Sequence, residues 1–129
     1  MLSSVSKRLA ALHEAGYVHR DLKPSNIMLM TTDKRWTVVG FSRAARAGTE
    51  MPLHLTLAYA APESVRAFAS GATTMACQPS QDAWALGVMA FELLTGASAF
   101  QIVTDGQSKV CRPYHPQRVQ RLPHVRRAA

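Results

Sequence analysis

The sequence predicts an α+β fold that is mainly helical, and three observations indicate it. An amphipathic segment opens the chain, two short apolar runs suited to a β-ribbon follow, and an almost wholly apolar segment of helical length lies at 82–95. With 129 residues, 47% of them hydrophobic and 18% charged, the chain has the composition of one globular domain. We expect the ordered part to span residues 1–101 and a basic tail without regular structure to span residues 102–129.

The first predicted helix covers Ser3 to Ala15. Its apolar residues recur at helical spacing, a serine can cap its start, and Gly16 can end it. The next segment, Tyr17 to Asn26, carries alternating polar residues and Pro24. Because proline interrupts a regular helix or strand, we expect a structured loop there.

Two short apolar runs, Ile27–Met30 and Trp36–Val39, are separated by a polar turn and predict a small two-stranded ribbon. A ribbon of this size is not stable alone, so a helix must pack beneath it. Gly40 to Ala61 shows little periodicity, which predicts a long surface segment. A short helix is expected at Glu63 to Ala69, after Pro62.

The second half of the chain is dominated by one apolar segment. Ser70 to Gln81 is rich in small and polar residues, which predicts a loop insertion. Asp82 to Thr95 is apolar almost all round, and a helix without a polar face is normally buried inside a domain. After Phe100 the helical pattern fades, and three prolines argue against a closing helix.

The net charge of +7 comes from the end of the chain. Up to Asp105 there are nine Lys/Arg and eight Asp/Glu, whereas residues 106–129 have six Lys/Arg and no acid. We therefore expect a solvated basic tail, with no nucleic acid as partner. Cys77 and Cys111 have no partner at metal-ligand spacing, so neither a zinc site nor a disulfide framework is indicated. No signal peptide or membrane-spanning run occurs, which makes a cytoplasmic location the default expectation.

The most informative segment is HRDLKPSN, at His19–Asn26. It resembles the catalytic loop of eukaryotic protein kinases, in which His-Arg-Asp is followed by an Asn five residues after the Asp. Thr56–Glu63, TLAYAAPE, looks like the end of a kinase activation segment, and Asp82–Gly96 looks like the central helix of the kinase C-lobe. Since these landmarks follow in the order of the family, the resemblance implies a kinase-like C-lobe, most similar to the serine/threonine type.

The resemblance implies a role for each polar residue of the loop. Asp21 would accept the proton of the attacking hydroxyl or orient it, and Lys23 would place a charge on the transferred phosphate. Asn26 would bind Mg²⁺ through its amide oxygen. ATP and Mg²⁺ are thus the implied cofactors, with Lys23 and Asn26 on the nucleotide side. The implied acceptor is a serine or threonine of a protein substrate.

Four further residues are implied as structural supports: His19, Arg20, Glu63 and Asp82. Arg20 would pair with a phosphorylated residue of the activation segment, for which Thr49 is the candidate. Thr56 would face the substrate. Asp82 would bond the backbone of the catalytic loop. Two plainer interpretations stay open, namely His19 as a core histidine and Arg20–Asp21 as a surface ion pair.

The sequence departs from the family where the metal-binding Asp-Phe-Gly is expected, because that place reads Gly40-Phe41-Ser42. Gly40 has no side chain to hold Mg²⁺. No Gly-rich loop precedes Ser3, so we expect no ATP-covering N-lobe and an apolar central helix with two uncovered faces. Three interpretations remain: a kinase-domain fragment that is inactive alone, a pseudokinase-type module that binds a partner protein, and an unconventional active enzyme.

Overall fold

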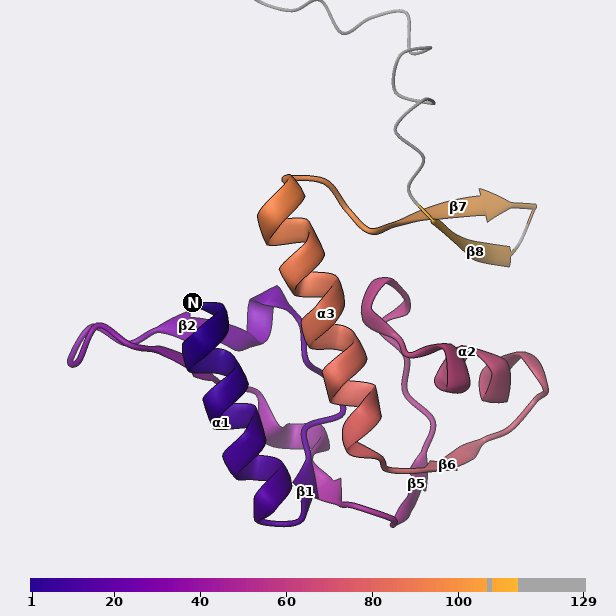
Figure 1. Cartoon of the computed structure of the whole chain (residues 1–129). Helices are drawn as coiled ribbons and strands as arrows, with labels where there is room; N and C mark the ends of the chain where they lie inside the picture. Colours follow the sequence, from indigo (N-terminus) through magenta and orange to yellow (C-terminus); the bar gives the residue numbers. More distant parts are fainter. Residues whose placement is uncertain (107, 114–129) are drawn as a thin grey trace, which may run out of the picture.

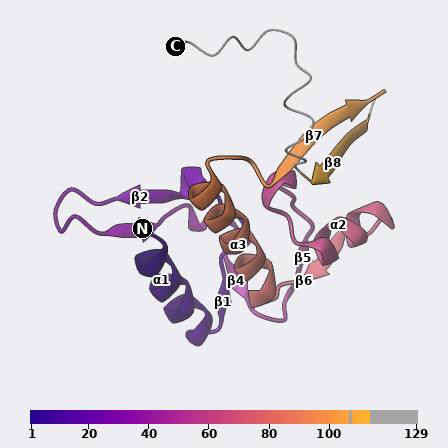
Figure 2. The same ribbon diagram turned by 45° about the horizontal axis from the view of Figure 1, so that its top comes forward.

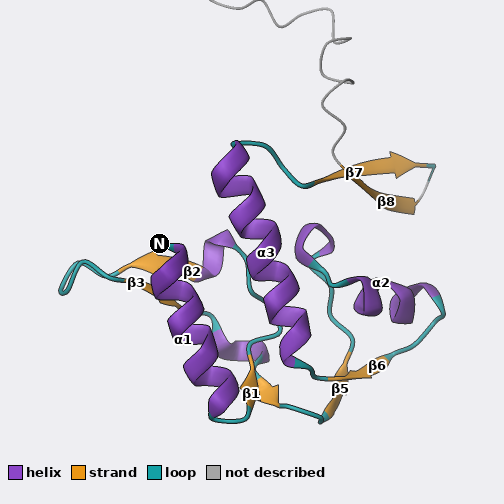
Figure 3. Ribbon diagram, in the orientation of Figure 1, coloured by secondary structure: helices purple, strands orange, loops and turns teal. Residues whose placement is uncertain are grey.

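The computed structural model of the protein describes residues 1–106 and 108–113, and shows helices surrounded by small β-pairs (Figures 1 and 3). The helices are α1 (Leu2–Glu14), α2 (Pro62–Ala69) and α3 (Pro79–Thr95). The strands pair antiparallel as β1 (Tyr17–Val18) with β4 (Ala45–Arg46), β2 (Ile27–Leu29) with β3 (Trp36–Val38), β5 (Glu50–Pro52) with β6 (Thr74–Ala76), and β7 (Phe100–Asp105) with β8 (Ser108–Pro113). The α+β, mainly helical prediction is confirmed.

Helix α1 packs on the β2–β3 ribbon and on α3, and this contact forms the core. The ribbon register pairs Ile27 with Val38, which turns both side chains inward. The core cluster consists of Val5, Leu9, Leu22, Ile27, Val38, Ala85 and Met89. Because burying an aliphatic side chain of this size contributes about 1.5–3 kcal/mol, this cluster holds the two halves of the chain together. The predicted first helix and the predicted ribbon are both confirmed.

Helix α3 runs through the middle of the molecule in Figures 1 and 2, yet only one side of it is buried. The buried residues are Asp82, Ala85, Val88 and Met89. Their spacing of three, four and seven positions marks a single helical stripe. The sequence predicts a central apolar helix with uncovered faces, and this pattern agrees with that expectation in the part of the chain that the structure describes. Trp84, Phe91, Leu93 and Leu94 of the same helix are exposed.

Two segments predicted as loops contain short regular elements. The 3-10 turns at Phe41–Arg43 and Leu57–Tyr59, with strands β4 and β5, lie within Gly40–Ala61. Strand β6 and the start of α3 lie within Ser70–Gln81. These strands are two or three residues long, and each pairs with a partner far away in the sequence. A local pattern does not encode such pairing, which is why sequence analysis missed it.

The third helix and the end of the described chain complete the fold. Helix α2 begins at Pro62, one residue before the predicted start at Glu63, and ends at Ala69 as predicted. Beyond α3, β7 and β8 form a hairpin within residues that the sequence analysis assigned to the tail, and the Phe100 ring stacks on Trp84 at 6.2 Å between centroids. The remainder of the predicted tail, residues 114–129, lies outside the described residues. Within the described part, no helix is long and apolar enough to cross a membrane.

Candidate active site

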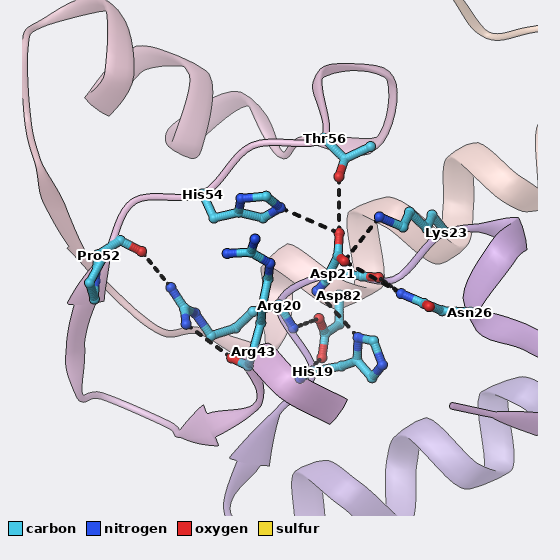
Figure 4. A network of polar contacts seen from close by, with 10 residues as sticks. All are labelled: His19, Arg20, Asp21, Lys23, Asn26, Arg43, Pro52, His54, Thr56 and Asp82. Atoms are coloured by element: carbon cyan, nitrogen blue, oxygen red, sulfur yellow. Dashed lines mark hydrogen bonds and ion pairs between the residues drawn. The ribbon is translucent and has the colours of Figure 1, made fainter. Parts of the chain in front are cut away.

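Asp82 of α3 fixes the loop that carries the kinase-like motif. Its carboxylate accepts the backbone N–H of His19 at 2.7 Å and that of Arg20 at 2.9 Å. On its other side it lies 2.9 Å from Nε2 of His13 on α1. The side chain is 1% exposed, and a buried carboxylate is costly unless donors surround it. These three donors meet that requirement and join α1, the loop and α3 at one point. Figure 4 shows the two contacts of Asp82 with the loop.

His19 connects the loop to the end of strand β3. Its side chain is fully buried, with Nε2 at 2.8 Å from the carbonyl of Val39 and Nδ1 at 3.2 Å from the N–H of Asp21. Because the Val39 carbonyl only accepts and the Asp21 amide only donates, the ring carries its proton on Nε2. The edge of the ring also meets Phe41, at 5.1 Å between centroids. His19 is thus a core histidine that also holds the loop in place.

Arg20 binds the segment 43–52, which precedes Thr56, through backbone carbonyls of that segment. Its guanidinium donates to the carbonyl of Arg43 at 2.9 Å and to that of Pro52 at 2.7 Å. The residue has φ of 69°, a conformation that is uncommon outside glycine. The resemblance implied a phosphorylated partner for this side chain. In the structure two carbonyls accept from two of its N–H donors and join both ends of the segment 43–52 to the loop.

The carboxylate of Asp21 lies at the centre of the polar network in Figure 4. Lys23 Nζ is 3.0 Å from Oδ2, and Thr56 donates its hydroxyl to Oδ1 at 2.9 Å. Asn26 donates Nδ2 to the backbone carbonyl of Asp21 at 2.7 Å. The predicted residues Asp21, Lys23 and Asn26 are therefore brought together, and Thr56 reaches them from the activation segment.

The environment of Asp21 keeps it ionised. Partial burial raises the pKa of this carboxyl, but the hydrogen bonds from Lys23 and Thr56 and the nearby positive charges outweigh that effect. The net result is a pKa below the ordinary value of 3.8. At neutral pH the carboxylate can therefore accept a hydrogen bond from an incoming hydroxyl.

His54, which sequence analysis did not single out, also faces Asp21. Its Nε2 lies 3.7 Å from Oδ1 of the carboxylate. Desolvation and the charge of Arg43 lower the pKa of this imidazole below 6.5, although Asp21 acts in the opposite direction. His54 is therefore neutral at neutral pH, and it forms a charged pair with Asp21 only in acid. No motif marks this histidine in the sequence, because it is one residue within an irregular segment.

Gly40 and Asn26 lie against one another. Gly40 has φ of 77°, and a Cβ placed on it would stand 2.7 Å from Cγ of Asn26 and closer still to its Oδ1. Real side chains do not pack so closely, so the amide of Asn26 fills the space that a side chain at position 40 would need. A side chain at position 40, where the resemblance implies an acidic residue, would therefore require the amide of Asn26 to move.

Glu63 is the one predicted site residue that lies apart from this network. It is in the first turn of α2, where its carboxylate accepts the hydroxyl of Ser80 at 3.2 Å. This bond links α2 to the beginning of α3. Glu63 acts here on the packing of two helices.

Comparisons with known proteins agree with this geometry. A family model described as the protein kinase domain matches residues 1–125. The serine/threonine-protein kinase PknL of Mycobacterium tuberculosis (strain ATCC 25618 / H37Rv) is 36% identical over 104 residues, which are 78% of this chain and 24% of PknL. Myotonin-protein kinase of Homo sapiens is 37% identical over 103 residues, which are 77% of this chain and 16% of that kinase.

The structural comparison gives the same family. The solved structure of the Cydia pomonella granulovirus kinase PK-1 is similar with a TM-score of 0.64 and 29% identity, over 83% of this chain and 39% of that chain. The chain spans about a quarter of the length of PknL. Sequence and fold together show that this chain belongs to the protein kinase family and is related to its serine/threonine kinases.

Proposed function

We propose that this chain carries the acceptor-positioning part of a serine/threonine kinase active site and does not transfer phosphate by itself. One observation carries the proposal: Lys23 and Thr56 hold the carboxylate of Asp21, while position 40, against Asn26, has no side chain. Protein kinases use ATP and Mg²⁺ and act on protein substrates. The acceptor is accordingly a serine or threonine hydroxyl of a protein.

The hydroxyl would be oriented by Asp21. Phosphoryl transfer depends mainly on positioning and on neutralising charge, with little covalent chemistry for the protein to perform. The ionised carboxylate accepts a hydrogen bond from the hydroxyl, and Lys23 Nζ, 3.0 Å away, places a positive charge beside the same point. Thr56 already donates to Oδ1, so it fixes the carboxylate and lines the approach of the acceptor.

The residues on the other side do not fit a Mg²⁺ ion. This ion requires oxygen ligands in near-octahedral arrangement and is usually held by at least one carboxylate. Gly40 offers no side-chain oxygen, and the Asp21 carboxylate is engaged by Lys23 and Thr56. Only the amide oxygen of Asn26 is left, facing Gly40. We therefore expect nucleotide binding to gain nothing from Mg²⁺.

Two measurements on the chain test this function. Calorimetric titration with ATP should give the same affinity in Mg²⁺ as in EDTA. Transfer of labelled phosphate to a serine-containing peptide should not exceed that of an Asp21→Asn variant, which retains the shape of the side chain and loses its charge. Phosphate incorporation that depends on Mg²⁺ and disappears in Asp21→Asn would refute the proposal.

A non-catalytic module that binds a partner protein is a second candidate, and the contacts of Arg20 favour it. Its guanidinium orders the activation segment through two carbonyls, without a phosphate group. A surface that is ordered in this way is available for docking at all times. Light scattering during size-exclusion chromatography separates the binding module from the incomplete kinase domain. A binding module must be monodisperse, whereas aggregation of the chain favours an incomplete domain.

A further inference from the structure

His54 lies beside the carboxylate of Asp21, in a position that the proposed function does not use. Its Nε2 is 3.7 Å from Oδ1 of Asp21, and Figure 4 draws this contact. Both side chains line a cavity of about 50 Å³, together with Thr56 and Arg20. About 10–15 Å³ is enough for one water molecule, so this cavity has room for a hydroxyl group and its hydration. The imidazole is 29% exposed, and solvent can therefore exchange its proton.

One acceptor site of the Asp21 carboxylate stays open. A carboxylate offers about four lone-pair sites. Lys23 and, at the longer distance of 3.5 Å, Asn26 contact Oδ2, whereas Thr56 contacts Oδ1. Among the contacts within the described residues, Oδ1 therefore has one further site, and His54 faces that oxygen. A separation of 3.7 Å is too long for a hydrogen bond, which leaves the site to an incoming hydroxyl.

The charge of His54 decides whether that gap closes. A neutral imidazole carries a proton on one nitrogen, whereas an imidazolium has an N–H at both nitrogens. Charge-assisted N–H bonds to carboxylates are about 2.7–2.9 Å long, so the imidazolium has to approach Oδ1 by roughly 1 Å. His54 belongs to an irregular segment between β5 and the 3-10 turn at Leu57–Tyr59, where rotation of the side chain can supply this movement.

The groups that face His54 set the pH at which it becomes charged. They are the cations Arg43, Lys23 and Arg20 and the anion Asp21. Desolvation and then the charge of Arg43 act most strongly, so the pKa of the imidazole lies below 6.5. The pKa of Asp21 is itself below 3.8. At neutral pH only Asp21 is charged, and between the two pKa values both groups are charged.

We propose that protonation of His54 closes the acceptor position: the imidazolium donates its Nε2–H to Oδ1 of Asp21 and takes the site that a substrate hydroxyl needs. The inference rests on the proposed function in one respect, which is that the hydroxyl binds Asp21. The acceptor position is open at neutral pH and closes as the pH falls through the pKa of His54. This regulation comes from a residue outside the loop His19–Asn26.

The pairing is tested by following the His54 ring signal of the full chain by NMR over a pH titration. His54→Phe retains a ring without nitrogen, and the signal that it removes is that of His54. Asp21→Asn removes the negative charge, so the pKa of His54 should fall. The matched control is Asp33→Asn, which removes the same charge from an exposed turn and should leave the titration unchanged. Equal His54 titrations in the parent and in Asp21→Asn overturn the inference.

Closure is tested with a short serine peptide and its alanine twin. Calorimetry compares them at neutral pH and at a pH where the ring signal shows full protonation of His54. At neutral pH the serine peptide should bind roughly tenfold tighter, which is the effect of one hydrogen bond to a charged group. In acid this preference should vanish in the parent chain and persist in His54→Phe. A preference that vanishes in both chains, or in neither, overturns the inference.

The proposed function and the closure by His54 fail in different ways. Peptides that bind equally at neutral pH refute the proposed function, because Asp21 then positions no hydroxyl. The pairing of His54 with Asp21 is decided separately by the NMR titration, which needs no peptide. A serine preference at neutral pH that does not change in acid upholds the proposed function and overturns the closure.

Discussion

Gly40 shows how one substitution changes its surroundings as well as itself. The residue adopts φ of 77°, a region that favours glycine, and its missing side chain leaves room for the Asn26 amide. Nδ2 of that amide donates to the Asp21 carbonyl, which holds the amide in position. The amide of Asn26 therefore fills the place where the resemblance implies a metal-binding acid.

Restoring an acidic residue there should not restore a metal site. Gly40→Asp forces a side chain into the left-handed region and against Asn26, so we expect a loss of about 1–2 kcal/mol in unfolding free energy. Chemical denaturation measures this loss. Adding Asn26→Ala to the same chain should recover part of it, because the obstructing amide is removed. A single Gly40→Asp variant that is as stable as the parent and binds ATP more tightly in Mg²⁺ would contradict this account.

Asp82 is the buried acid on which the position of the loop depends. In Asp82→Asn the charge is lost, and the amide NH₂ group would face a backbone N–H donor. We expect a loss of about 2–3 kcal/mol in unfolding free energy. Asp33→Asn is the control, because Asp33 accepts the N–H of Arg35 in an exposed turn. This substitution should cost less than about 1 kcal/mol in unfolding free energy. Equal losses in the two variants would show that Asp82 does not anchor the loop.

Sequence analysis went further with some site residues than with others. The motif placed Asp21, Lys23 and Asn26 in one loop, where local spacing is sufficient. The contact of Asp82 with that loop was implied only by resemblance to a family. Asp82 and His19 are 63 positions apart in the sequence, and local spacing does not predict a contact over that range. His54 and Arg43 were missed because only the folded path of the activation segment turns them toward Asp21.

Among the elements, the 3-10 turn at Leu57–Tyr59 is linked to α3 by a hydrogen bond of Tyr59. Tyr59 donates its hydroxyl to Glu92 at 2.8 Å. Burial and the neighbouring carboxylate raise the pKa of Tyr59 to about 12. Because the folded pKa exceeds the ordinary value of 10.0, this contact stabilises the protein fully below pH 10.0 and is lost as the pH rises toward about 12.

Removal of this hydroxyl should loosen the end of the activation segment. Tyr59→Phe leaves Glu92 without its donor and should cost about 1 kcal/mol at neutral pH. The difference in ultraviolet absorbance between the parent and this variant should titrate with a midpoint near 12. Tyr17→Phe is the control, because Tyr17 is an exposed tyrosine. A midpoint near 10 for Tyr59 would show that the bond to Glu92 is not formed.

Regular elements with strong periodicity were predictable, and short paired strands were not. The first helix and the β2–β3 ribbon were predicted within a few residues, because their apolar spacing is local. The β1–β4 and β5–β6 pairs were missed, since two-residue and three-residue strands carry no periodic signal. The apolar segment Asp82–Thr95 predicted a helix with uncovered faces, but composition alone does not say which faces those are.

The whole molecule leaves one side of α3 facing solvent. Phe91, Leu93 and Leu94 are exposed on this helix, and Leu94 retains 80% of its surface. Large apolar surfaces on soluble domains favour association. The region matched in PknL is about a quarter of the length of that kinase.

A charge on this surface should reduce self-association. Leu94→Lys should raise the concentration at which the chain remains monomeric in light scattering, with a change in stability within about 0.5 kcal/mol because the side chain is already solvated. Met28→Lys is the matched control: Met28 is 51% exposed on β2, away from α3. If both variants improve solubility equally, net charge is the cause and the α3 surface is not.

The central claim is that position 40 and Asn26 no longer hold a metal ion beside an otherwise ordered catalytic loop. Paramagnetic Mn²⁺ tests it most directly, because it replaces Mg²⁺ and broadens the NMR signals of nearby amides. With Mn²⁺ and ATP added, we expect no selective broadening of the Asn26 and Gly40 amides. Saturable broadening confined to those two residues, and reversed by excess Mg²⁺, would contradict the account.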